Sequence, residues 1–259
     1  MTEPAVVLNG VSKQYGSFSA AEDISITIPK GELFGFLGPN GAGKTTTIKM
    51  MTGLLEPTDG TIEIGGINMW KQPLQAKKKI AYVPDHPTLY EKLTGWEYIR
   101  FIASVFGIPA RQAEEKAVRL FDLFSLGSRA DELIEGYSHG MKQKMALTGA
   151  LLHDPDVIFL DEPTVGLDPK SAKTLKDLLR QLCDDGTTVF VSTHILEIAQ
   201  EMCDRIGIIR DGKIAALGTM EELRGESSAS LEDIFLELTG DEEQQELIRE
   251  LAGGRADAP

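Results

Sequence analysis

The segment Gly38-Pro-Asn-Gly-Ala-Gly-Lys-Thr45 constrains the fold of this chain more than any other part of the sequence. It matches G-x-x-x-x-G-K-[S/T], the pattern of a phosphate-binding loop. The apolar run Leu33–Leu37 before it predicts a buried central strand, and a helix is predicted from about Gly43 to Thr52. A strand, a glycine-rich loop and a helix in this order predict an α/β fold with a P-loop NTPase core.

The residue types in this loop predict how a nucleotide binds. Glycines let backbone N–H groups curl around phosphate oxygens, and the helix N-terminus adds positive potential. Lys44 can reach the β- and γ-phosphates, and the Thr45 hydroxyl can bind Mg²⁺. We therefore expect ATP and Mg²⁺ as cofactors. The expected ATP-binding residues of the loop are Gly38, Pro39, Asn40, Gly41, Ala42, Gly43, Lys44, Thr45 and Thr46.

Two acidic residues, Asp161 and Glu162, follow the apolar segment Val157–Leu160, which predicts a second buried strand. In an open α/β sheet, ligands gather at the carboxyl ends of the strands. Asp161 is therefore expected to hold the metal through water, and Glu162 to polarise an attacking water as the catalytic base.

The pattern of apolar and polar residues in the rest of the sequence divides the chain into subdomains. Alternating Ile24, Ile26 and Ile28 predict a half-buried strand in an N-terminal antiparallel β subdomain. From residue 86 to 154 the pattern is helical. Thr94 and Glu97 form a capping box there. Ser138 can cap a later helix, and apolar residues recur at helical spacing. That spacing is typical of core packing, as at Ala113, Ala117, Leu120, Phe121 and Phe124.

The α/β pattern returns after residue 154. Asp168-Pro169 opens a helix, and Asp211-Gly212 lies between two apolar segments as in a β-hairpin. Capping boxes at Thr219/Glu222 and Ser230/Asp233 predict a helical tail. We predict a nucleotide-binding core of residues 1–85 and 155–218, an inserted helical subdomain of residues 86–154, and a C-terminal helical tail of residues 219–259.

Composition restricts the partners. The 259 residues include 40 acidic and 26 basic ones, a formal net charge of −14. Such a chain repels nucleic acid unless it has a local basic patch, and the run Lys77–Lys79 is read as a solvated face. No segment has the eighteen or more apolar residues that span a bilayer, and no secretory signal is visible. Cys183 and Cys203 are expected to be reduced thiols of a cytosolic protein.

The order of motifs resembles that of the ATP-binding subunits of ABC transporters over nearly the whole chain. The elements that carry the resemblance, in the family's order, are Tyr15, Gly38–Thr45, Asp85, Ser138-His139-Gly140, Asp161-Glu162, Gly166-Leu167-Asp168 and His194. The resemblance implies that Tyr15 stacks on adenine and that His194 contacts the γ-phosphate and the attacking water. It implies catalytic roles for Lys44, Glu162 and His194, and metal contacts for Thr45, Asp85 and Asp161.

The resemblance also implies that two copies bind ATP between them. Ser138, His139 and Gly140 occupy the family's signature position and would contact the γ-phosphate of the ATP held by the second copy. The loop at Gly166–Asp168 would join the two sites across the dimer. A homodimer is expected, with a heterodimer of two different ATPase chains as the alternative.

Two departures from the family pattern stand out. Asp85 replaces the usual glutamine after a Tyr-Val-Pro segment. In the usual Leu-Ser-Gly-Gly-Gln signature, His139 replaces a glycine and Met141 replaces the glutamine. We expect these changes to affect the rate more than the reaction.

Two segments, Ser138–Gln143 and Leu231–Thr239, resemble the corresponding segments of one branch of the family. This branch consists of the stand-alone ATPases of bacterial exporters for antibiotics, peptides or sodium, including Ecs-type subunits. This branch implies a separately encoded integral membrane permease, no nucleic acid, and a peripheral location on the cytoplasmic face of the membrane. The alternatives are a soluble ABC-type ATPase acting on nucleic acid or ribosomes, and a regulatory module that binds ATP without turnover. The acidic balance disfavours the former, and Glu162 and His194 disfavour the latter.

Overall fold

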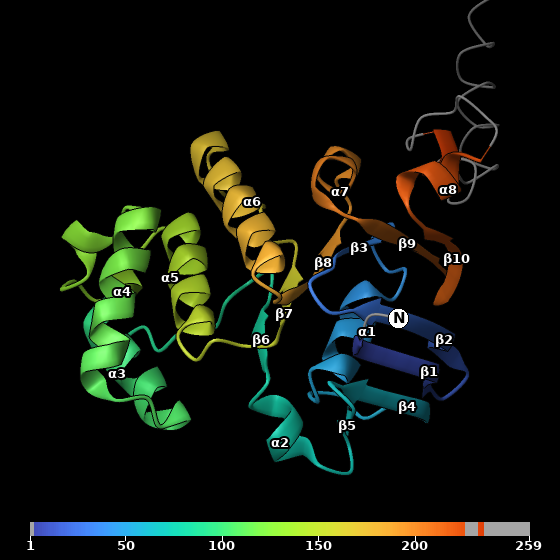
Figure 1. Ribbon diagram of the computed structural model, residues 1–259, viewed down its shortest axis with the longest axis horizontal. Helices are drawn as coiled ribbons and strands as arrows, with labels where there is room; N and C mark the ends of the chain where they lie inside the picture. The colour runs from blue at the N-terminus through green and yellow to red at the C-terminus, as the bar shows by residue number, and fades with distance from the viewer. Residues whose placement is uncertain (1–2, 226–232, 236–259) are drawn as a thin grey trace, which may run out of the picture.

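The computed structural model describes residues 3–225 and 233–235 and contains two β-sheets with helices around them (Figure 1). The elements in chain order are β1 (Pro4–Tyr15), β2 (Phe18–Pro29), β3 (Leu33–Leu37), α1 (Lys44–Met51), β4 (Asp59–Ile64), β5 (Ile67–Asn68), α2 (Pro73–Lys77), β6 (Ile80–Val83), α3 (Gly95–Phe106), α4 (Ala110–Phe124), the 3₁₀ turns η1 (Gly127–Arg129) and η2 (Ile134–Gly136), α5 (His139–Leu151), β7 (Val157–Asp161), α6 (Pro169–Asp184), β8 (Thr188–Thr193), α7 (Leu196–Met202), β9 (Arg205–Arg210), β10 (Lys213–Gly218) and α8 (Met220–Arg224).

The smaller sheet is antiparallel, with strand order β2-β1-β4-β5. Its apolar side chains alternate as the sequence predicts, and Ile24, Ile26 and Ile28 are buried. The first strand is much longer than the apolar segment Val6–Leu8 suggests. Pairing with β2 continues to Tyr15 through several register shifts, which a pattern of alternating residues does not reveal.

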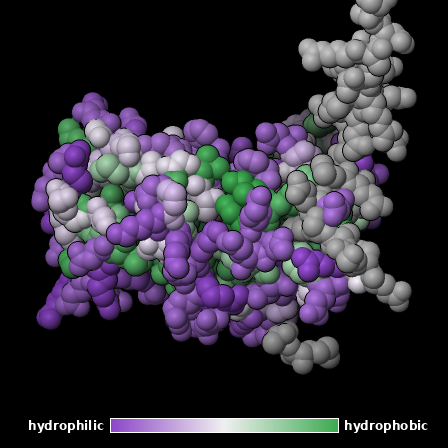
Figure 2. Space-filling model, turned by 90° about the horizontal axis from the view of Figure 1, so that it is seen from above, coloured by the Kyte–Doolittle hydropathy of each residue, from purple (hydrophilic) through white to green (hydrophobic). Residues whose placement is uncertain are grey.

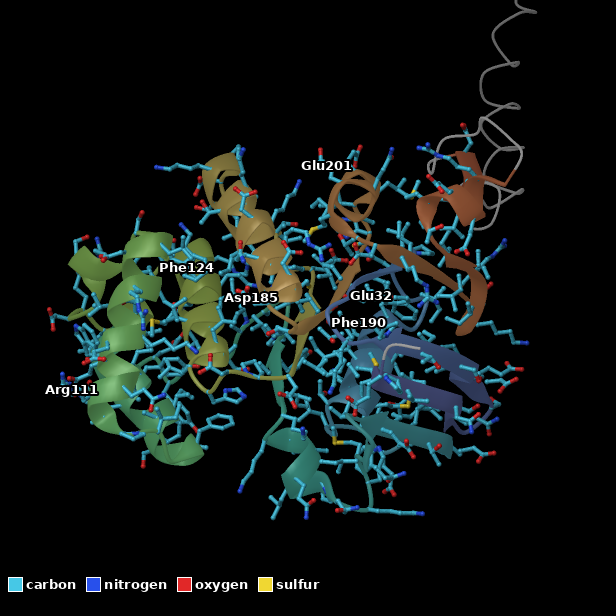
Figure 3. The ribbon with its side chains drawn as sticks, viewed as in Figure 1. Glu32, Arg111, Phe124, Asp185, Phe190 and Glu201 are labelled. Carbon is cyan, nitrogen blue, oxygen red and sulfur yellow. The ribbon has the colours of Figure 1, made fainter. Side chains whose placement is uncertain are left out.

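The larger sheet has strand order β10-β9-β3-β8-β7-β6, and its five strands from β9 to β6 are parallel. All residues of β3, β7 and β8 are buried, as expected for strands covered on both faces. Phe190 of β8 lies in the middle of this sheet (Figure 3), and its ring centroid is 5.5 Å from that of Phe34 and 5.8 Å from that of Phe159. This aromatic packing holds β3, β7 and β8 together below their carboxyl ends.

Three helices, α3, α4 and α5, form the part of the molecule farthest from the antiparallel sheet (Figure 1). The predicted capping box at Thr94 and Glu97 is present, and Ser138 caps α5. The predicted apolar stripe of α4 is buried against α3 and α5. Phe124 of α4 belongs to this core, whereas the side chain of Arg111 extends from the outer edge (Figure 3).

Local signals near the end of the chain are also confirmed. The Asp211-Gly212 turn joins β9 and β10, and both residues have positive φ, as a type I′ hairpin turn requires. Thr219 and Glu222 form the predicted capping box of α8. The capping box at Ser230 and most of the proposed tail lie outside the described residues.

Within residues 3–225 and 233–235, no helix has the length and apolar character needed to span a bilayer. The face seen from above is mainly hydrophilic, with hydrophobic side chains gathered in a few patches near its middle (Figure 2).

Candidate functional site

The phosphate-binding loop joins the carboxyl end of β3 to α1, and close packing restricts its glycines. Gly41 and Gly43 have φ of 82° and 107°, values that residues with a side chain rarely adopt. A Cβ at Gly43 would lie 2.4 Å from the Ala20 carbonyl oxygen, and one at Gly38 would lie 2.5 Å from the Ile209 carbonyl oxygen. The loop therefore keeps its shape only with glycine at these positions.

Lys44 lies folded over its own loop. Its side chain is 7% exposed, and Nζ donates to the carbonyl oxygens of Gly38, at 2.6 Å, and Pro39, at 3.1 Å. Nζ is also 4.0 Å from Oε1 of Glu162. Burial lowers the pKa of Lys44 below its ordinary value, while the charges of Glu162 and Asp161 raise it in part. The ammonium is therefore poorly solvated. The two carboxylates neutralise its charge only in part, so it can still attract an anion that enters the pocket.

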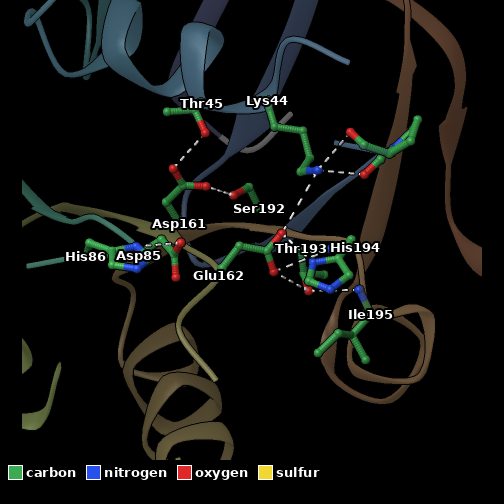
Figure 4. A network of polar contacts seen from close by, with 12 residues as sticks. Lys44, Thr45, Asp85, His86, Asp161, Glu162, Ser192, Thr193, His194 and Ile195 are labelled. Carbon is green, nitrogen blue, oxygen red and sulfur yellow. Dashed lines mark hydrogen bonds and ion pairs between the residues drawn. The ribbon is translucent and has the colours of Figure 1, made fainter. Parts of the chain in front are cut away.

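Asp161 is the last residue of β7 and is 4% exposed. Its Oδ2 accepts a hydrogen bond from Thr45 Oγ1 at 2.9 Å, and its Oδ1 accepts one from the Ser192 hydroxyl (Figure 4). The adjacent strands β7 and β8 place Ser192 opposite Asp161 in register. The carboxylate is thus fixed beside Thr45, the residue predicted to bind the metal.

Glu162 is also held firmly. Its φ of +50° is unusual for a residue with a side chain, and such strain often marks functional positions. Its Oε1 lies 2.8 Å from His194 Nδ1, and its Oε2 accepts hydrogen bonds from Thr193 Oγ1 at 3.2 Å and the His194 backbone N–H at 3.4 Å (Figure 4). The sequence-predicted base and histidine are therefore direct partners.

Asp85 follows β6 and borders the same pocket. Its Oδ2 lies 2.8 Å from His86 Nδ1, and its side chain is 35% exposed. Its Oδ1 is buried and has no hydrogen-bond partner in the structure, so it remains available as an oxygen ligand.

These groups surround a pocket of about 250 Å³. The residues that line it are Phe18, Ala20, Pro39, Asn40, Gly41, Gly43, Lys44, Thr45, Thr46, Asp85, Asp161 and Glu162. Sequence reasoning did not identify Phe18 and Ala20, which lie on β2, but chose Tyr15, which is not part of this lining. The signal that could have found Phe18 is the hairpin turn after Tyr15, because it places these two aromatic residues opposite each other.

The expected signature residues lie elsewhere. Ser138 Oγ accepts from the Met141 backbone N–H at 3.3 Å and begins α5. Ser138, His139 and Gly140 do not line the pocket of their own chain. The ring of His139 packs over Gly166, and its centroid is 5.5 Å from that of His86.

The oxygen atoms at this site suit Mg²⁺. A hydroxyl and a carboxylate meet at Thr45 and Asp161, and Asp85 adds a second carboxylate. Magnesium prefers oxygen ligands and is often bound by one or two carboxylates together with substrate phosphates. Among the described residues, no group of three or more His, Cys, Asp or Glu side chains could hold a metal by itself. A Mg²⁺ ion that is bound jointly by these protein oxygens and by the phosphates of a nucleotide would fit this arrangement.

The family model described as ABC transporter matches residues 21–165. The linearmycin resistance ATP-binding protein LnrL of Bacillus subtilis (strain 168) is 40% identical over 213 residues, which cover 82% of this chain and 68% of LnrL. The probable multidrug ABC transporter ATP-binding protein YbhF of Escherichia coli (strain K12) is 36% identical over 245 residues. That match covers 92% of this chain and 42% of YbhF, so the chain spans less than half of that relative.

Solved structures of ATP-binding cassettes are also similar to this chain. The structure described as that of an ATP-binding subunit of an ABC transporter has a TM-score of 0.86 and 34% identity, covering 90% of this chain and 99% of that one. A dimeric post-hydrolysis structure of the ATP-binding cassette MJ0796, bound to ADP and Pi, has a TM-score of 0.76 and 26% identity. It covers 83% of this chain and 98% of the cassette.

Proposed function

Because the chain belongs to the ABC transporter family, as an ATP-binding and ATP-hydrolysing subunit, we propose that it uses ATP hydrolysis at the pocket around Lys44 to drive a separate membrane permease. The observation that carries this proposal is the meeting of three groups. Lys44, Glu162 and His194 come from the phosphate loop and from two neighbouring strand ends, and they lie in one polar network (Figure 4).

The roles of the residues follow from this geometry. The phosphates would enter the loop of residues 38–46, where backbone N–H groups and the Lys44 ammonium bind them. Glu162 would accept the hydrogen bond of a water aimed at the γ-phosphate, because its carboxylate is already held by Thr193 and His194. His194 would orient that carboxylate and contact the γ-phosphate. Thr45, Asp161 and Asp85 would hold Mg²⁺, which neutralises charge on the phosphates when bound.

A second copy would complete the site. Ser138 does not line the phosphate pocket of its own chain. Ser138 caps the thirteen-residue helix α5, whose N-terminus would suit a phosphate presented by another chain. The dimeric structure of the MJ0796 cassette supports this arrangement, and we propose a homodimer around two ATP molecules.

Mixing two inactive variants tests the shared site. Glu162→Gln lacks the base, and Ser138→Arg places a bulky cation in the dimer interface. Each protein alone should be almost inactive. The mixture should recover part of the ATPase rate, since one interface then pairs an intact Glu162 with an intact Ser138. No recovery, together with no ATP-dependent dimer of Glu162→Gln, would contradict the shared-site proposal.

An apolar groove supports a membrane partner. It has a volume of about 380 Å³ and lies between the core and the helices, with Tyr82, Ile102 and Phe106 in its lining. Tyr90 follows the groove residue Leu89 in sequence and is 59% exposed, and Val105 precedes the groove residue Phe106 and is 63% exposed. We propose that the permease docks here and keeps the subunit at the cytoplasmic face of the membrane. LnrL is named as a linearmycin resistance protein and YbhF as a probable multidrug transporter protein, and both names support an exporter.

Co-purification from native membranes tests this partner. The full chain with Val105→Glu is the matched comparison. Val105 is exposed and adjoins the groove residue Phe106 in sequence, so a charge there should oppose an apolar partner, and Val105 does not line the nucleotide pocket. An integral membrane protein should accompany the unmodified chain and be depleted with Val105→Glu. Recovery of ribosomes or nucleic acid in its place would favour the soluble ABC-type alternative.

A further inference from the structure

Helix α2 (Pro73–Lys77) lies at the lower edge of the molecule, away from α6, α7 and α8 (Figure 1). It is anchored by Ala76, which is fully buried, while the other residues of the helix are exposed. Leu74 is 76% exposed, more than any other large hydrophobic side chain in the described part of the chain. Single exposed hydrophobic residues are ordinary on a protein surface, so the neighbours of Leu74 decide whether it has a role.

Three lysines surround Leu74. Lys71 lies three residues before it, in the turn that leads into the helix, and Lys77 and Lys78 follow it by three and four residues. Side chains at these spacings on a helix are neighbours. All three lysines are exposed, and no acidic side chain of the described residues forms an ion pair with them, whereas Lys79, the next residue, has such a pair. We call Lys71, Leu74, Lys77 and Lys78 the α2 patch.

The α2 patch adjoins the apolar groove at which the permease is proposed to dock. A Cβ at Gly53 would lie 2.7 Å from Cε of Lys77, so the stem of this lysine packs against the turn after α1. Leu54, the residue after Gly53, is 62% exposed and lines the groove. A membrane protein docked in the groove would therefore bring the bilayer to the side of the molecule that carries the α2 patch.

The local charge of the α2 patch is opposite in sign to that of the whole chain. The chain has a formal net charge of −14, which an anionic surface repels. At physiological ionic strength, exposed charges more than about 8 Å apart are largely screened from each other. A surface at α2 therefore meets mainly the three lysines. Lysines attract anionic lipid headgroups, and an exposed leucine between them can enter the headgroup region with its apolar side chain.

We propose that the α2 patch binds the anionic lipid headgroups of the membrane beside the permease. This inference rests on the proposed function, because the permease in the groove would place the bilayer on this side of the molecule. Three lysines and one leucine bind a bilayer weakly by themselves. Next to a docked permease they would act at a high effective concentration and strengthen the attachment of the subunit. The polar backbone of a nucleic acid would attract the lysines but would offer no apolar layer for Leu74.

Vesicle sedimentation with the purified full chain tests the α2 patch. At low ionic strength the chain should bind vesicles that contain phosphatidylglycerol more strongly than vesicles of phosphatidylcholine alone. The double variant Lys77→Gln/Lys78→Gln should lower the partition coefficient on anionic vesicles by about tenfold or more, since each lysine contributes about a factor of five. Leu74→Trp should raise it, and the added indole should shift the fluorescence to shorter wavelength on anionic vesicles, because tryptophan favours the interface.

The matched control is Lys170→Gln/Lys173→Gln. Both lysines are exposed on α6 and have no ion pair among the described residues, so this variant changes the net charge equally at a distant site (Figure 1). It should keep the partition coefficient of the unmodified chain. All variants should have the circular dichroism spectrum of the unmodified chain, which separates a lost contact from a lost fold.

Several results would overturn the lipid contact. One is equal binding of the α2 double variant and the unmodified chain to anionic vesicles, and another is an equal loss in the α6 control, because net charge alone would then explain binding. Absence of vesicle binding would also overturn it, and loss of the co-purified permease from the double variant would then assign the lysines to an acidic segment of the permease. Vesicle binding through the patch without any co-purified permease would support the lipid contact and contradict the proposed function.

Discussion

His194 and Glu162 face each other at the carboxyl end of the central sheet, with Nδ1 of the histidine 2.8 Å from Oε1 of the glutamate. The same oxygen lies 4.0 Å from Lys44 Nζ. The expected base, the histidine beside it and the lysine of the phosphate loop therefore lie in one polar network. Phosphate oxygens carry more negative charge than the loop carbonyls and would attract the Lys44 ammonium more strongly.

We expect Glu162→Gln to retain ATP binding and to lose turnover by about a hundredfold or more, because the amide keeps the size of the side chain but cannot act as a base. Steady-state phosphate release and equilibrium ATP binding measure the two effects separately. His194→Ala serves as a comparison and should lower turnover less, since it leaves the carboxylate in place. Unchanged turnover in Glu162→Gln would move the base elsewhere, with His194 the next candidate.

Asp85 should contribute to Mg²⁺ binding. Asp85→Ala removes a carboxylate that lines the pocket, so a higher Mg²⁺ concentration should be needed for half-maximal ATPase activity. His86→Ala is the matched control, because it removes the partner of Asp85 and leaves the carboxylate. If Asp85→Ala behaves like the unmodified chain in isolation and differs only with the permease present, Asp85 acts on the partner and not on the metal.

Gly166 and His139 should be coupled in stability. A Cβ at Gly166 would lie 2.4 Å from Cδ2 of His139, and Gly166 has φ of 77°. We expect Gly166→Ala to lower the free energy of unfolding by about 1–3 kcal/mol. Combining it with His139→Gly should recover part of that loss, because the clash disappears and only the backbone strain remains. Denaturant unfolding of the two single variants and the double variant measures the interaction, and simple additivity would contradict it.

His153 should make stability depend on pH. Its Nε2 is 3.0 Å from the Ile80 carbonyl oxygen, and its ring is stacked on Phe106 with centroids 3.8 Å apart. Burial lowers the pKa of His153 in the folded state below its ordinary value of 6.5. The unfolded chain therefore binds a proton first as the pH falls, and stability present above pH 6.5 is lost as the pH drops through this value toward the folded pKa.

Urea unfolding at pH 7.5 and pH 5.5 measures this effect. The unmodified chain should lose more stability between the two conditions than His153→Phe, which keeps a ring against Phe106 but cannot be protonated. The difference between the two proteins removes the contribution of the other histidines. An equal loss in both would show that His153 does not titrate differently on unfolding.

The sequence alone determined the features that depend on short segments of chain. The glycines of residues 38–43 and Lys44 form the phosphate loop through local backbone conformation and neighbouring side chains. The capping boxes at Thr94 and Thr219 and the hairpin turn at Asp211-Gly212 are local for the same reason. The apolar runs of β3 and β7 identify buried strands, because their burial on both faces leaves no polar positions.

Only the tertiary structure decided which distant residues meet. Thr45 and Asp161 are 116 residues apart and bond because β3 and β7 both flank β8, an order set by pairing between strands that are far apart in sequence. The same pairing places His194 on Glu162. The register shifts of β1 bring Phe18 to the pocket and Tyr15 opposite it. Local patterns do not encode strand order or register over such separations, since these depend on the packing of the whole core.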